Sequence, residues 1–207
     1  MKYHKDLKIK MQICQIIKDS FQEFIGEWSL VLFSYGCNFK CKFCYNLDYI
    51  SEPNNIIGDA VPLIEKNISP AHTAVVFLGG EPTIWDHRLI EAVEFVKSKN
   101  LKTKIYTNAS KPDVIEELEQ KNIMDCYSID FKAIKNVKDV IGINMTDSDY
   151  LSLLDKSISL LIKNNKNLEL RTTTWDNVMD VRDISEYIKK KYPGINHILQ
   201  KPWRVNS

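Results

Sequence analysis

Short apolar runs alternate with longer amphipathic runs along most of the chain. Six of the short runs predict buried strands, because they are rich in Val, Ile, Leu and aromatic residues. These strands are expected over residues 28–35, 73–78, 102–107, 126–131, 167–174 and 195–200. Apolar residues at helical spacing predict helices over residues 59–67, 84–99, 112–121, 150–163 and 178–191. A further amphipathic helix is expected near the start of the chain, over residues 6–24.

This alternation of strands and helices indicates right-handed β-α-β units around a parallel sheet. Six such units fit in 207 residues, whereas a complete eight-unit barrel needs about 250 residues. We therefore expect an α/β fold, namely a partial, laterally open (β/α)6 TIM-like barrel, with a flat doubly wound sheet as the alternative. Residues 26–207 should form the barrel domain and residues 1–25 an N-terminal helical extension, in a chain that is a single domain overall.

Two of the predicted strands carry polar side chains on one face only. Residues two apart share a face, because successive side chains of a strand point to opposite sides. The polar faces hold Ser128, Asp130, Lys132, Glu169, Arg171 and Thr173. Since a strand covered by helices on both sides should be apolar on both faces, the pattern favours a polar lumen. An exposed sheet edge is the alternative.

The charges balance, with 28 Lys and Arg against 27 Asp and Glu and a net charge of +1. No bulk field attracts nucleic acid or an anionic membrane, so neither is an expected partner. No apolar run approaches the roughly 20 residues that cross a bilayer, and the N-terminus lacks the apolar core of a signal peptide. We expect a cytoplasmic protein, in a compartment that keeps thiols reduced.

The stretch GCNFKCKFC, directly after the first predicted strand, holds three of the five cysteines. They are Cys37, Cys41 and Cys44. Barrel enzymes build their active sites at this end of the strands, and thiolates select zinc or iron–sulfur clusters. A structural zinc site needs four ligands, and neither His4 nor His72 has the spacing of a fourth. On a four-iron cluster, three cysteines leave one iron open. Zinc with a remote ligand and buried thiols without metal are the alternatives.

The pattern Cys37-x3-Cys41-x-Phe43-Cys44 resembles the signature of the radical S-adenosylmethionine (SAM) enzymes. FLGGEPT (77–83) and YTNA (106–109) are similar to the family's second- and third-strand endings. The resemblance implies a partial (β/α)6 barrel and a 4Fe-4S cluster that binds SAM at its open iron. Reductive cleavage of SAM then yields a 5′-deoxyadenosyl radical, which abstracts hydrogen from the substrate. Implied cofactor contacts are Phe43 at the adenine, Gly79, Gly80, Glu81 as an acceptor for the ammonium, Thr107 and Asn108.

SIDFKA (128–133) and ELRTTTW (169–175) resemble motifs of the enzymes that activate glycyl radical enzymes. The resemblance implies that Asp130 helps to hold a monovalent cation and that Lys132 neutralises the SAM carboxylate. Arg171 is implied to bind a carboxylate or a substrate backbone. A strand-end ion pair is the plainer interpretation of Asp130 and Lys132. The expected catalytic and cofactor-binding set therefore also includes Asp130, Lys132 and Arg171 beside the three cysteines.

The implied partners are a glycyl radical enzyme, with anaerobic ribonucleotide reductase expected, and an electron donor such as flavodoxin or ferredoxin. One alternative is a radical enzyme that acts on a small molecule, as a deazapurine synthase does, or on a peptide. Another is a non-enzymatic zinc or iron–sulfur module. Cys14 and Cys126 are too few for a second four-cysteine cluster and are expected to pack as small apolar residues.

Overall fold

The computed structural model describes residues 10–174 and 181–201; His4 and Trp175, the last residue of the ELRTTTW stretch, lie outside this part. It contains one eight-stranded sheet of order β3-β1-β2-β4-β5-β6-β7-β8. The strands are β1 (Gln12–Ser20), β2 (Ser29–Ser34), β3 (Gly58–Asp59), β4 (Ala74–Gly79), β5 (Lys102–Thr107), β6 (Cys126–Asp130), β7 (Asn167–Thr173) and β8 (Asn196–Gln200). The helices are α1 (Leu47–Ile50), α2 (Ala60–Asn67), α3 (His87–Ser98), α4 (Pro112–Gln120), α5 (Val137–Ile141), α6 (Asp147–Lys163) and α7 (Val181–Lys191), with 3-10 turns at Pro53–Asn55 and Pro82–Trp85.

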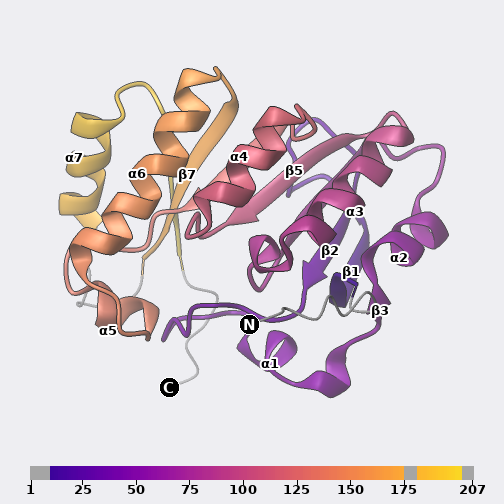
Figure 1. Ribbon diagram of the computed structural model, residues 1–207, viewed down its shortest axis with the longest axis horizontal. Coiled ribbons are helices and arrows are strands. Elements are labelled where there is room, and N and C mark those ends of the chain that lie inside the picture. Colours follow the sequence, from indigo (N-terminus) through magenta and orange to yellow (C-terminus); the bar gives the residue numbers. More distant parts are fainter. Residues whose placement is uncertain (1–9, 175–180, 202–207) are drawn as a thin grey trace, which may run out of the picture.

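Six strands form a continuous parallel part of the sheet, in the order β2, β4, β5, β6, β7 and β8. Helices α2, α3, α4, α6 and α7 lie side by side along one face of this sheet (Figure 1). A flat doubly wound fold would carry helices on both faces. The sheet is open, with β3 and β8 as its edges. The predicted partial, laterally open (β/α)6 barrel is therefore confirmed.

The two faces of the sheet are packed differently, as the strand parity predicted. Tyr127, Ile129, Leu168 and Leu170 belong to the large apolar cluster beneath the helices. A smaller apolar cluster includes Phe24, Val31, Ala74, Val76, Leu78 and Cys126. Each large side chain buried under the helices contributes about 1.5–3 kcal/mol. The helix-facing side of the sheet thus supplies most of the core. The other side has room for polar groups at the carboxyl ends of the strands.

The prediction of a helix over residues 6–24 is wrong across the described part of that segment. Residues Gln12–Ser20 form β1, which pairs antiparallel with β2 and also with β3. Short apolar runs fit a strand or a helix equally well by periodicity, and Ile13, Ile16 and Ile17 are β-branched residues that favour strands. The free edge of β2 decides the outcome, because pairing there satisfies its backbone groups. The segment extends the same sheet instead of forming a helical extension.

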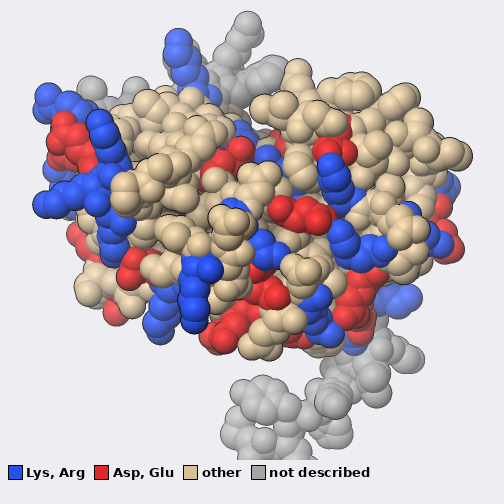
Figure 2. Space-filling model, turned by 90° about the horizontal axis from the view of Figure 1, so that it is seen from above, with Lys and Arg blue, Asp and Glu red and all other residues tan. Residues whose placement is uncertain are grey.

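Charged side chains of both signs are interspersed over the face shown in Figure 2. This mixture agrees with the balanced composition of 28 basic and 27 acidic residues. Within residues 10–174 and 181–201, no helix is both long and apolar enough to span a membrane.

Candidate functional site

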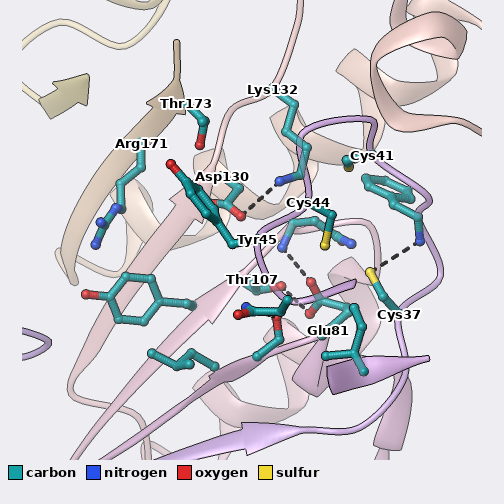
Figure 3. Close-up of a pocket in the computed structure, with 18 of the residues that line it drawn as sticks. Cys37, Cys41, Cys44, Tyr45, Glu81, Thr107, Asp130, Lys132, Arg171 and Thr173 are labelled. Carbon is teal, nitrogen blue, oxygen red and sulfur yellow. Dashed lines mark hydrogen bonds and ion pairs between the residues drawn. The ribbon is translucent and has the colours of Figure 1, made fainter. Parts of the chain in front are cut away.

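A cavity of about 290 Å³ lies at the carboxyl ends of the parallel strands. The structure brings together there every side chain that the sequence predicted for the site. These residues are Cys37, Cys41, Phe43, Cys44, Gly79, Gly80, Glu81, Thr107, Asn108, Asp130, Lys132 and Arg171. They come from five strand ends spread over 135 positions of the chain (from 37 to 171, counted inclusively). Figure 3 shows the three cysteines on one side of this cavity and Asp130, Arg171 and Thr173 on the other.

The cysteine-bearing loop (residues 35–46) leaves β2 and crosses the open end of the barrel. The Lys40 amide donates to the Ile141 carbonyl at 2.8 Å, which fixes the loop to α5. Phe39 is buried and its ring lies 6.3 Å from that of Tyr150 on α6. The Phe39 amide donates to the Cys37 sulfur at 3.3 Å. The loop is therefore anchored by its own apolar residue and by backbone bonds.

The loop packs against the Gly79–Gly80 turn through direct backbone contact. The Gly80 amide donates to the Ser34 carbonyl and the Glu81 amide to the Gly36 carbonyl, both at 2.9 Å. A Cβ added to Gly80 would lie 1.8 Å from the Gly36 oxygen. Gly79 has a φ of 109°, which an L side chain rarely adopts. Glycine is required at both positions: Gly80 for space, and Gly79 for its conformation and also for space, since a Cβ there would lie 2.6 Å from the Ser34 nitrogen.

The Glu81 carboxylate lies 1% exposed beneath this turn. Its Oε1 accepts from the Thr83 amide, the Thr83 hydroxyl and the Thr107 hydroxyl, at 3.1, 2.6 and 2.7 Å. Its Oε2 accepts from the Asn108 amide at 2.6 Å. Both oxygens are thus engaged by the protein itself, although the sequence suggested an acceptor for the cofactor ammonium. Burial raises the pKa of Glu81, and the four donors oppose that shift.

On the opposite wall, the Lys132 ammonium pairs with the Asp130 carboxylate at 3.0 Å. Burial is the largest single influence on the pKa of Lys132 and lowers it, but the Asp130 charge, the Cys41 charge and the hydrogen bond to Asp130 together outweigh burial, so the net shift is upward and the amine stays charged. The ammonium also lies 5.7 Å from the centre of the Phe43 ring. The Lys132 amide donates to the Tyr150 hydroxyl at 2.8 Å, which fixes the strand end. The ion pair thus fixes the positive charge of Lys132 beside the cysteine loop.

Arg171 lies deeper in the same wall, with its guanidinium 4.7 Å from the centre of the Tyr106 ring. Its Nε is buried and has no hydrogen-bond partner. A terminal nitrogen is 3.7 Å from Glu169, which also accepts from Lys104 at 2.9 Å and Ser128 at 2.8 Å. The guanidinium is thus held between the Tyr106 ring and Glu169 and lines the cavity, where an arginine can bind a carboxylate.

Sequence reasoning missed several members of the site. Tyr45 follows the last cysteine of the motif, and its hydroxyl donates to the Lys201 carbonyl at 2.8 Å. Asn46 donates to the Gly79 carbonyl at 3.0 Å. Tyr106 stacks under Arg171 and its hydroxyl donates to the Glu23 carbonyl at 2.9 Å. Tyr45 and Asn46 directly follow the last cysteine and Tyr106 begins the YTNA stretch, so a position in or beside a motif was the only signal in the sequence. The partners of all three lie far away along the chain.

Residues 31–170 match the family model for the radical SAM superfamily, which is more than half of the chain. The chain belongs to the radical SAM superfamily. A relative from Methanocaldococcus jannaschii is 34% identical over 183 residues, which cover 87% of this chain and 75% of the relative. That relative carries the provisional name of a glycyl-radical enzyme activating enzyme. A 7-carboxy-7-deazaguanine synthase from the same organism is 24% identical over 184 residues, covering 79% and 71% respectively.

Two solved structures share the radical SAM fold of this chain. TYW1 with a lysine-pyruvate adduct gives a TM-score of 0.59 at 17% identity, covering 89% of this chain and 69% of that one. Native anSMEcpe with bound AdoMet and a Kp18Cys peptide gives 0.57 at 16% identity, covering 81% and 49%. This chain therefore spans about half of the length of anSMEcpe. At such identities the likeness concerns the fold alone.

Membership of the family implies a 4Fe-4S cluster and SAM, and the donor set fits them. Cys37, Cys41 and Cys44 form no disulfide and line one cavity. The described residues contain no group of three or more His, Cys, Asp or Glu arranged for a single metal ion. Burial raises the pKa of Cys37 to about 12 and also raises that of Cys41, so iron binding must displace their protons.

Proposed function

We propose that this radical SAM protein is an activase that forms a glycyl radical on a partner enzyme, with an anaerobic ribonucleotide reductase as that partner. The observation that carries the proposal is the convergence of Asp130, Lys132 and Arg171 on the cavity lined by the three cysteines. The relative with 34% identity, named as a glycyl-radical enzyme activating enzyme, supports the same substrate class.

The residues of this chain would divide the work between holding the cofactors and placing the substrate. Cys37, Cys41 and Cys44 would hold the cluster, which together with SAM supplies a 5′-deoxyadenosyl radical that abstracts hydrogen. Lys132 would neutralise the SAM carboxylate from its buried position. Asp130, 36% exposed at its side chain, would bind a monovalent cation there. Flavodoxin or ferredoxin is the proposed electron donor.

The mouth of the cavity offers apolar contact area to a protein substrate. Tyr45, Leu47 and Tyr49, here called the α1 rim, are 44%, 49% and 48% exposed. Tyr45 also lines the cavity, so the α1 rim continues directly into the site. Aromatic and aliphatic side chains of this kind are typical anchors of protein interfaces. This surface supports a substrate larger than a metabolite.

The proposal is tested with iron-reconstituted protein, SAM, dithionite and purified anaerobic ribonucleotide reductase from the source organism. We expect an oxygen-sensitive glycyl radical signal by electron paramagnetic resonance (EPR), stoichiometric with methionine release. A reductase whose radical-bearing glycine is changed to alanine is the control and should give no signal. Cleavage of SAM without any glycyl radical on the reductase would reject this substrate assignment.

A second candidate is a radical SAM enzyme for a small carboxylate. Arg171 favours it, because its guanidinium lines the cavity and an arginine can bind a carboxylate there. The relationship to a 7-carboxy-7-deazaguanine synthase, at 24% identity, also points there. Deoxyadenosine formation that depends on an added small carboxylate, and not on the reductase, would select this candidate.

A further inference from the structure

We propose that Glu81 is a positioning residue whose carboxylate locks the Gly79–Gly80 turn to the end of β5 and, through Asn108 and Asn38, to the cysteine loop. It would thereby act on cluster and SAM binding without touching SAM itself. The proposal concerns the cofactor site of the family and does not depend on the glycyl radical assignment.

The first support is that the protein engages both oxygens of the carboxylate. Four donors from Thr83, Thr107 and Asn108 approach its two oxygens at 2.6–3.1 Å. The Thr107 hydroxyl is oriented by the Ala109 amide, which donates to it at 3.0 Å and leaves its proton for Glu81. All four groups donate, so the site suits an ionised carboxylate. Oε1 already accepts three hydrogen bonds and Oε2 accepts one, so the carboxylate is oriented by the protein before any cofactor ammonium could donate to it.

The second support is the chain of hydrogen bonds that leads from Glu81 to the cysteines. Asn108 takes part twice: its amide donates to Glu81, and its side-chain Nδ2 donates to the Asn38 Oδ1 at 2.9 Å. The Asn38 Nδ2 in turn donates to the Ser110 hydroxyl at 2.7 Å. Asn38 lies directly after Cys37 in the chain. One buried carboxylate therefore sets the spacing of the glycine turn, the β5 end and the cysteine loop.

Two residues of this network can be changed without altering the lining of the cavity. Neither Asn38 nor Thr83 is among the residues that line it. Asn38→Ala removes the last link to the cysteine loop and leaves all four donors of Glu81 in place. Thr83→Val keeps the shape of the side chain and removes one hydroxyl donor. If Glu81 contacted SAM directly, these two changes would have little effect on SAM binding.

The test measures iron content, SAM affinity and the EPR spectrum of the reduced cluster with and without SAM, in the absence of any partner enzyme. We expect Asn38→Ala and Thr83→Val each to weaken SAM binding roughly 10–100-fold, as loss of outer-shell support does at metal sites. The spectral change that SAM induces should shrink or shift in both variants. Asn67→Ala is the matched control, because Asn67 makes one side-chain bond at 2.8 Å, to Leu63 on α2.

Wild-type SAM affinity and spectra in both variants would overturn the proposal. Loss of SAM binding in Glu81→Gln alone would then mark its carboxylate as a direct ligand. Because Glu81→Gln places an amide N–H₂ against donors, its folding is at risk, and the outcome is decided by Asn38→Ala and Thr83→Val. No outcome of this assay depends on the glycyl radical, so it separates this inference from the proposed function.

Discussion

Two regions border the cavity and differ in packing. The wall formed by the cysteine loop and the glycine turn, here called the packed wall, consists of closely packed backbone, whereas the α1 rim consists of exposed side chains. Between the cysteine loop and the glycine turn, Gly36 and Gly80 touch through their main chains and Glu81 is 1% exposed. At the α1 rim, by contrast, three large side chains are nearly half exposed. The close backbone contacts fix the conformation of the packed wall, which suits the binding of cofactors of fixed shape. The α1 rim exposes apolar side chains, which suits a partner protein that binds transiently.

The largest effect is expected for the cysteines of the packed wall. Alanine at Cys37, Cys41 or Cys44 should reduce SAM cleavage to the level of iron-free protein, because two thiolates cannot complete the cluster. The measurement is deoxyadenosine formation together with iron per chain after anaerobic reconstitution.

Cys14 and Cys126 provide the controls for that prediction. Both are buried, and neither lines the cavity. The Cys14 sulfur donates to the Phe33 carbonyl at 3.3 Å, and Cys126 packs in the smaller apolar cluster. Alanine at either should leave the cluster intact. Loss of iron in these variants would place the cluster elsewhere.

The second largest effect is a loss of stability, which is expected when an added side-chain atom separates the glycine turn from the cysteine loop. Gly80→Ala sets a Cβ 1.8 Å from the Gly36 oxygen, and overpacking against a fixed neighbour costs about 3 kcal/mol or more. Gly26→Ala is the contrast, since nothing lies within 4 Å of its Cβ and only its φ of 85° opposes alanine, at about 1–2 kcal/mol. Urea unfolding of the iron-free proteins measures both. Equal losses of unfolding free energy in the two variants would show that Gly80 and the Gly36 oxygen are not in tight contact.

The smallest effect is expected at the α1 rim. The double change Leu47→Ser and Tyr49→Ser should lower the glycyl radical yield about 5-fold at limiting partner, since such contacts are each worth about 1 kcal/mol or less. SAM cleavage without partner should stay the same. Ile162→Ser on α6, where Ile162 is 44% exposed, is the matched control. An unchanged radical yield in the double variant would move the docking surface away from the α1 rim.

Much of the site could be predicted because its residues belong to local patterns. Cys37, Cys41 and Cys44 lie within eight positions of one another, and Asp130 and Lys132 share a strand face by simple alternation. Parallel strands carry their carboxyl ends to one edge, so motifs after consecutive strands had to meet there. The roles of these residues remain predictions, but their convergence on one cavity is a finding.

The sequence by itself determined the six parallel strands, the helices between them, the polar face of two of these strands and the loop that carries the cysteines, because each depends on neighbours a few residues away. Only the tertiary structure decided that Gln12–Ser20 is a strand, since the free edge of β2 selects among conformations that the segment alone leaves nearly equal. It also decided that Glu81 faces Thr107 and Asn108, 26 and 27 positions away, and that Tyr45 reaches Lys201, 156 positions away. Such contacts follow from the closing of the whole sheet, whose geometry no short stretch of sequence contains.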